Sequence, residues 1–288
     1  MKTENILSPM RMYLFKLVWR GVFGFLLIAG AGCVATNPAN VEHILNVKDG
    51  LSPFYSFLEG QGTDNDADRV FTMRKGVLRI SGQHFGYLAT KKRYSDYRLV
   101  AEFKWGEKTW EPRKFNARDS GILLHGNGKD QVWPKSIECQ MIEGGTGDIL
   151  VVSGALLTVD GVTKGPAIAR FDRPGRNPWR DEIGFRGPYE IEKPHGQWNT
   201  IEVICDGGKI GIAINGHKTL EGTNATPHEG RILLQSEGAE VFSAAWICTH
   251  FTKIWEIEFA ARKTQSCLCA LYGADASGVA CMCGSSGR

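Results

Sequence analysis

The chain has 288 residues, 42% of them hydrophobic, which is enough for one large β domain or two small ones with a sizeable core. Its 34 basic and 31 acidic residues give a formal net charge of +3, which excludes a nucleic-acid-binding polycation and an acidic tail protein. The 35 glycines and 8 tryptophans, arranged as glycine-rich turns between aromatic-rich strands, indicate an all-β protein.

The first 33 residues have the pattern of an export signal. Basic residues (Arg11, Lys16, Arg20) precede an apolar run that is too short for an ordinary membrane span, and small residues then lead to Cys33. This order resembles a bacterial lipobox and predicts an exported envelope lipoprotein, anchored to the membrane through a lipid on Cys33. Gly30 stands where a Leu is usual, so plain secretion and an uncleaved anchor stay open as alternatives. Residues 34–48 are interpreted as a linker.

From residue 49 onward, short alternating apolar segments predict a dozen or so strands, separated by turns such as Asn215-Gly216. The absence of a long helical pattern favours two antiparallel sheets in a sandwich. The expected strands are Arg69–Met73, Val77–Ser81, Gly86–Thr90, Tyr97–Trp105, Ser120–His125, Ser136–Glu143, Asp148–Val152, Ala167–Phe171, Trp198–Cys205, Lys209–Ile214, His217–Glu221, Arg231–Ser236 and Ala239–Phe242.

Two insertions and the tail depart from this pattern. The segments 106–117 and 172–195 are long and polar, which is typical of functional loops. Residues 49–242 are therefore predicted as the domain, and residues 243–288, which lose the alternation, as a divergent tail. Cys139 and Cys205 fit buried strand positions. The tail's C-x-C pairs, Cys267/Cys269 and Cys281/Cys283, suit disulfides or an unstructured end better than zinc.

The most informative stretch is residues 117–148, with two alternating segments around a polar loop. Side chains on a strand alternate between its two faces, so Glu138 and Gln140 fall on one face and Ile137, Cys139 and Met141 on the other. His125 ends the preceding segment and is expected to converge with Glu138 and Gln140 on a concave, polar face.

Five segments in order resemble the 3-keto-disaccharide hydrolase domain family: FGYLATKKRYSDYRLVAEFKWG, ARDSGILLHG, VWPKSIECQMIEGGTGD, GQWNTIEVICDGGKIGIAINGH and GRILLQSEGAEV. The resemblance covers roughly residues 54–242. It implies a concanavalin-like jelly-roll β-sandwich that cleaves the glycosidic bond of carbohydrates oxidised at C3. A separate sugar 3-oxidoreductase makes the ketone and is a partner only in the pathway.

That chemistry needs a general base, a group that polarises the enolate oxygen, and a proton donor for the leaving group. His125 and Glu138 are the predicted acid/base residues, or metal ligands if a divalent metal takes part; no cofactor is firmly predicted. Glu143 joins them only if a bulge turns it to the same face. Gln140 is expected to bind sugar hydroxyls.

Aromatic and charged residues around this stretch complete the predicted site. Trp133 and Trp110 are expected to stack on a sugar ring, and Arg118, Asp119 and Lys135 to line the rim. Ordinary packing, structural hydrogen bonds and solvated charges are the alternatives for these residues.

Two other functions remain open at this point. The same fold serves non-catalytic carbohydrate-binding modules, because fold does not fix function. The segment E-C-Q-M-I-E also resembles the E-x-D-x-x-E strand of laminarinase-like glycosidases on unoxidised glucan, although Gln140 replaces the middle acid.

Mass spectrometry of the mature protein from a bacterial host tests the predicted anchor. We expect an N-terminus at Cys33 that carries the added mass of acyl chains, and loss of membrane association in Cys33→Ser. An unmodified Cys33, or a mature chain that begins elsewhere, would contradict the lipoprotein prediction.

Overall fold

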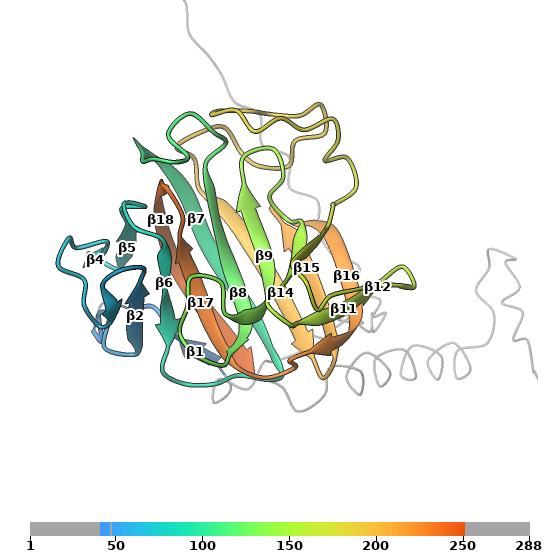
Figure 1. The fold of residues 1–288 in the computed structure, drawn as a ribbon, viewed down its shortest axis with the longest axis horizontal. Coiled ribbons are helices and arrows are strands. Elements are labelled where there is room, and N and C mark those ends of the chain that lie inside the picture. The colour runs from blue at the N-terminus through green and yellow to red at the C-terminus, as the bar shows by residue number, and fades with distance from the viewer. Residues whose placement is uncertain (1–40, 47, 251–288) are drawn as a thin grey trace, which may run out of the picture. The chain divides into compact units, whose positions relative to one another are not determined.

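The computed structural model describes residues 41–46 and 48–250, which fold into two antiparallel sheets without a helix (Figure 1). The signal segment, Cys33 and the C-x-C pairs lie outside these residues. Within the described part, no helix is long and apolar enough to cross a membrane. The predicted all-β, concanavalin-like sandwich of two antiparallel sheets is confirmed.

The first sheet has ten strands in the order β12-β11-β16-β15-β14-β7-β18-β5-β4, with β1 beside β18. Their bounds are β1 Val41–His43, β4 Phe71–Arg74, β5 Val77–Ile80, β7 Tyr97–Thr109, β11 Leu156–Val159, β12 Val162–Lys164, β14 Asn199–Asp206, β15 Lys209–Ile214, β16 His217–Thr226 and β18 Ala239–His250.

The second sheet has eight strands in the order β13-β10-β9-β8-β17-β6-β2-β3. Their bounds are β2 Phe54–Leu58, β3 Gly62–Thr63, β6 Gly86–Thr90, β8 Asp119–Asn127, β9 Lys135–Ile142, β10 Ile149–Val152, β13 Ala169–Phe171 and β17 Arg231–Ser236.

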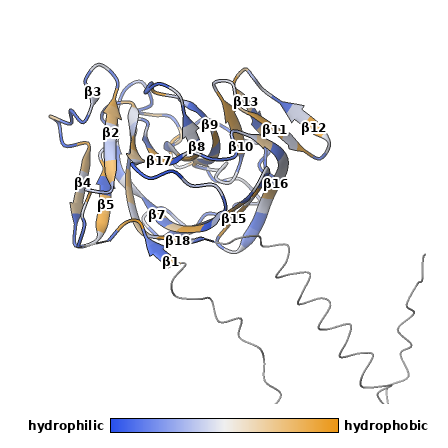
Figure 2. Ribbon diagram, turned by 90° about the horizontal axis from the view of Figure 1, so that it is seen from below, coloured by the Kyte–Doolittle hydropathy of each residue, from blue (hydrophilic) through white to orange (hydrophobic). Residues whose placement is uncertain are grey.

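Figure 2 shows the two layers, with β7, β18 and β15 in one and β17, β8 and β9 in the other. Buried apolar side chains from both sheets form the core. The long central strands contribute every second side chain, for example Leu99, Ala101 and Phe103 from β7. Burial of this apolar surface, worth roughly 25 cal/mol per Å², stabilises the sandwich. The opposite face of the second sheet is therefore available for polar groups.

The last strand extends past the domain boundary predicted at Phe242. β18 continues to His250 and pairs with β7 along most of its length, with a register shift between Ala244 and Ile247. Ala245 has a positive φ of 52° at this bulge, so the buried positions move from Ser243 to Trp246. The bulge interrupts the alternation of buried and exposed residues, and for this reason the strand predicted from the sequence ended too early.

The predicted linker also contributes to the sandwich. β1 pairs with the end of β18, and Ile44 and Leu45 are buried in the core. The short strands β2, β3, β11 and β12 were not predicted either. The second predicted insertion, residues 172–195, is confirmed as a loop, whereas the first is shorter than predicted because β7 extends to Thr109.

Candidate active site

The outer face of the second sheet carries the predicted pair Glu138 and Gln140. Both lie on β9 and are buried, whereas Ile137, Cys139 and Met141 on the same strand belong to the core. The register between β8 and β9 is regular from Asp119 to Leu124, so the alternation in the sequence is preserved in the structure. The predicted division of β9 into a polar and an apolar face is confirmed.

Gly121 provides the space in which these polar groups meet. It lies opposite Gln140 on β9, and a Cβ atom built at this position would collide with the Glu138 carboxylate and the side-chain oxygen of Gln235 from β17. Gly121 therefore forms the floor of the site, because only a residue without a side chain leaves room for both groups.

Asp119 lies beside this floor within a network of charged and amide groups. Gln140 Nε2 donates to Asp119 Oδ1 over 2.7 Å, and an Arg113 guanidinium nitrogen lies 3.3 Å from Asp119 Oδ2. Arg113 also pairs with Asp181 at 3.1 Å, which connects the 172–195 loop to the site. Within the described residues, the buried side-chain oxygens of Gln140 and Gln235 accept no hydrogen bond and so are free for sugar hydroxyls.

Glu237, which the sequence analysis did not select, is the third carboxyl group of the cluster. It follows Gln235 by two residues, so the alternation along β17 carries it to the same face. The Trp133 indole donates a hydrogen bond to it, and Arg113 is close enough to attract it. The alternation of β17, continued two residues past Gln235, is the sequence signal that could have identified Glu237.

All three carboxyl groups have raised pKa values, with burial as the largest cause. The negative charge of Glu237 is the next cause for Asp119 and for Glu138, whose pKa values lie well above the ordinary range. The pKa of Glu237 is raised to about 7, because Arg113 and the Trp133 hydrogen bond offset part of the burial. The cluster therefore holds protons near neutral pH and can both donate and accept one.

His125 does not join this cluster, contrary to the prediction. It has a positive φ of 56° at the bulge of β8, which turns its ring toward the inside of the sandwich, 5.7 Å from the ring of buried Tyr97. Burial lowers the pKa of His125 to about 4, so the imidazole is neutral at pH 7. It is placed as a structural histidine beside the carbonyl of Pro227, 3.3 Å from Nδ1.

Glu143 and Arg118 are also turned away from the cluster. The β8–β9 register has no bulge that would bring Glu143 to the Glu138 face. Instead its carboxylate accepts hydrogen bonds from the backbone and the guanidinium of Arg118, at 3.0 and 2.8 Å, and from the backbone of Gly184 at 2.7 Å. This buried pair fastens the 172–195 loop to the sheet.

The remaining predicted residues divide between site and scaffold. Trp133 is 39% exposed and packs edge-on against Phe85, so it has the exposed ring that sugar stacking needs. Trp110 instead donates its indole hydrogen to the carbonyl of Ser81 at 2.9 Å, which anchors its loop. The side chain of Lys135 lies near Gly154.

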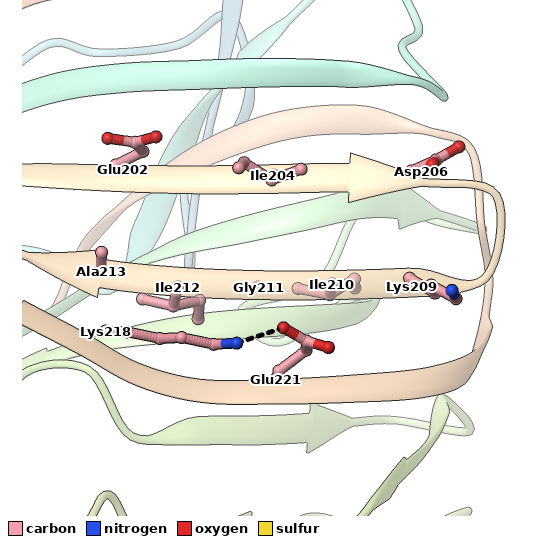
Figure 3. A pocket seen from close by; sticks show the side chains of 10 residues that line it. All are labelled: Glu202, Ile204, Asp206, Lys209, Ile210, Gly211, Ile212, Ala213, Lys218 and Glu221. Atoms are coloured by element: carbon pink, nitrogen blue, oxygen red, sulfur yellow. Dashed lines mark hydrogen bonds and ion pairs between the residues drawn. The ribbon is translucent and has the colours of Figure 1, made fainter. Parts of the chain in front are cut away.

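A separate hollow of about 310 Å³ lies on the first sheet, over β14, β15 and β16 (Figure 3). Its floor includes Ile204 and Ala213, and its charged rim includes the ion pair Lys218–Glu221. None of the acid cluster lines it, so it is no part of the candidate site. Among the described residues, no group of three or more His, Cys, Asp or Glu side chains is placed to hold a metal ion.

One family of known proteins matches most of the described chain. The model of the 3-keto-alpha-glucoside-1,2-lyase-like domain matches residues 54–247, and the chain belongs to this family. It is accordingly a carbohydrate-active, glycoside-acting domain, and the match extends past the boundary predicted at Phe242.

Solved structures that are similar to this chain are distant in sequence. A Parabacteroides distasonis protein, provisionally described as a glycosyl hydrolase, is 16% identical, covers 74% of this chain and 94% of its own, and has a TM-score of 0.48. A Bacillus licheniformis beta-glucanase is 11% identical over 73% and 97%, with a TM-score of 0.42. The carbohydrate-binding module CBM66 from Bacillus subtilis is 11% identical over 67% and 93%, with a TM-score of 0.38. No curated protein matches the chain.

Replacing Glu237 tests the burial of its carboxyl group, which is the cause of its raised pKa. The pKa of Glu237 is about 7 in the folded chain against 4.5 ordinarily, so its protonation stabilises the fold below pH 4.5 and this contribution is lost as the pH rises to 7. Glu237→Gln should therefore raise the free energy of unfolding at pH 8 by on the order of 1–3 kcal/mol, and change it little at pH 4. Denaturant unfolding at both pH values measures this difference.

The exposed Glu59 provides the matched control. Glu59→Gln should leave the free energy of unfolding unchanged at both pH values. A Glu237→Gln protein that is less stable than the wild type at pH 8 would show that the carboxylate is well accommodated, and would contradict the destabilising burial of its charge.

Proposed function

We propose that this domain cleaves the glycosidic bond of glycosides oxidised at C3, by elimination at the outer face of the second sheet. The observation that carries the proposal is a pair of carboxyl groups with different proton affinities in a domain of this family. Glu138 lies over Gly121, and Glu237 is close enough for its charge to raise the pKa of Glu138. Glu237 is poised to act as the base, and Glu138 as the acid.

The proposed reaction balances between these two groups. The Glu237 carboxylate takes the proton from C2, which the C3 ketone has acidified, and the electron pair forms the enolate. The C1–O bond then breaks as the C1=C2 bond forms and the ketone returns, while Glu138 gives its proton to the leaving oxygen. Addition of water across C1=C2 restores both carboxyl groups and completes a net hydrolysis.

Neighbouring groups supply binding and charge stabilisation. Arg113 is a permanent cation beside Asp119, suited to stabilise the developing enolate oxygen. The unpaired oxygens of Gln140 and Gln235 suit sugar hydroxyls. The exposed Trp133 ring suits the apolar face of a pyranose. A separate oxidoreductase has to supply the ketone, and the proposed lipid on Cys33 would hold the enzyme at the envelope.

A laminarinase-like double displacement is less well supported. It needs a second free carboxylate on β9, yet the carboxylate of Glu143 is occupied by Arg118 and Gly184. A non-catalytic binding module would have no use for carboxyl groups whose proton affinity is raised by burial and mutual repulsion.

Product analysis on matched glycosides tests the proposed substrate class. Purified protein should release the alcohol or sugar from 3-keto-glucosides and 3-keto-disaccharides, and leave the unoxidised counterparts and laminarin intact, because only the ketone acidifies C2. The same assay with and without chelator determines whether a divalent metal takes part. Binding of unmodified glycan without turnover would favour a non-catalytic binding module. Release of reducing ends from laminarin would favour a glycosidase on unoxidised glucan.

Variants at the floor and the two carboxyl groups test the site. Glu138→Gln and Glu237→Gln should each lower kcat by on the order of 100-fold or more, because each removes a proton-transfer group. Gly121→Ala should lower kcat/KM by at least about tenfold, because the added methyl group displaces the Glu138 carboxylate.

Gly211 on β15 is the matched glycine control, because a Cβ there would meet no atom within 4 Å. Gly211→Ala should retain full activity, and circular dichroism should show that every variant is folded. Full activity in folded Glu138→Gln or Glu237→Gln would refute the assignment of that residue.

A further inference from the structure

The loop between β8 and β9, residues 128–134, is tied down across the sheet by a single carboxylate. Asp130 accepts hydrogen bonds from the hydroxyls of Tyr87 on β6 at 2.7 Å, Tyr55 on β2 at 2.9 Å and Thr63 on β3 at 3.1 Å. In the sheet, β17 and β6 separate β8 from β2. The loop therefore spans the outer face as a strap instead of projecting from the edge.

The hydroxyl groups of Tyr55 and Tyr87 under the strap act as hydrogen-bond donors to Asp130. Burial is the largest cause that raises the pKa of both tyrosines, Tyr55 to about 12 and Tyr87 further, and the hydrogen bond to Asp130 is the next cause. Below the strap, the side chains of Leu123, Leu233 and Ala89 form a small apolar cluster with Tyr87. The strap is thus held both by charge-assisted hydrogen bonds and by a buried apolar surface.

Trp133 lies three residues beyond Asp130, at the other end of the strap. Its carbonyl accepts hydrogen bonds from the Ser153 hydroxyl at 2.7 Å and from Gln131 at 3.0 Å, and its ring packs edge-on against Phe85 at 6.2 Å. Its indole donates to Glu237. The strap therefore connects the tyrosine cluster to the acid cluster.

We infer that Asp130 is a positioning residue that fixes the Trp133 ring at the edge of the acid cluster. Trp133 then has two tasks that both depend on its position, namely a stacking surface for the substrate and a hydrogen bond that lowers the pKa of Glu237. The role toward substrate rests on the proposed function. The position of the ring is a property of the protein alone and can be measured without substrate.

Nitrogen-15 NMR of the labelled full chain measures that position. The Trp133 indole N–H signal is assigned by its absence in Trp133→Phe. It should shift or broaden in Asp130→Ala, shift less in Asp130→Asn, which retains an acceptor oxygen, and stay unchanged in Lys129→Ala. Lys129 is the exposed neighbour of Asp130 in the same loop and makes a matched control.

Kinetics on a 3-keto-glucoside give the second measurement. Asp130→Ala should raise KM by about tenfold, because the Trp133 ring no longer stacks on the substrate. It should also shift the rising limb of the pH–kcat profile to higher pH, because the pKa of Glu237 rises when the hydrogen bond from Trp133 is lost. In the Trp133→Phe background the same substitution should have little further effect, since coupled residues are not additive.

An unchanged Trp133 signal in both Asp130 variants would overturn the inference, as would an equal loss of activity in the presence and absence of Trp133. A shifted signal in the Asp130 variants, together with a wild-type protein that turns over no 3-keto-glucoside, would support the positioning role while refuting the proposed function. If Asp130→Ala does not fold, Asp130→Asn provides the same comparisons.

Discussion

Three carboxyl groups, those of Asp119, Glu138 and Glu237, share one buried polar face beside the guanidinium of Arg113. Glu138 is 2% exposed, and no described residue donates a hydrogen bond to its carboxyl group. Burial raises the pKa of Asp119, Glu138 and Glu237, and the charge of Glu237 raises the pKa of the other two further, whereas Arg113 lowers the pKa of Asp119 and of Glu237. Some of these carboxyl groups therefore keep their protons near neutral pH, and such groups can act as acids in catalysis.

The rest of the sandwich makes this arrangement rigid. The pleat of β8 and β9 separates a polar face from an apolar one, and the absence of a side chain at Gly121 leaves room for the cluster. Buried ion pairs then fasten the long loop beside it, Arg118 with Glu143 and Arg176 with Asp148 at 2.6 Å. Breaking one partner of such a buried pair is costly, so these residues stabilise the loop beside the site.

Local periodicity allowed the sandwich and the Glu138/Gln140 face to be predicted, because a period of two is a property of neighbouring residues. The errors arose where backbone geometry interrupts that period. Positive φ angles at His125 and Ala245 turn the chain, which moves one side chain into the interior and hides the continuation of β18. Glu237 was overlooked because it follows the strand end, and the partners of Glu143 come from distant segments that no local pattern reveals.

Proton exchange at C2 of the sugar is the event that distinguishes this account from direct displacement at C1. Turnover of a 3-keto-glucoside in D₂O, followed by proton NMR of the product, measures it. Elimination with Glu237 as base predicts that the product carries deuterium at C2 in excess of the enzyme-free rate. Cleavage that leaves the original proton at C2 would contradict the account.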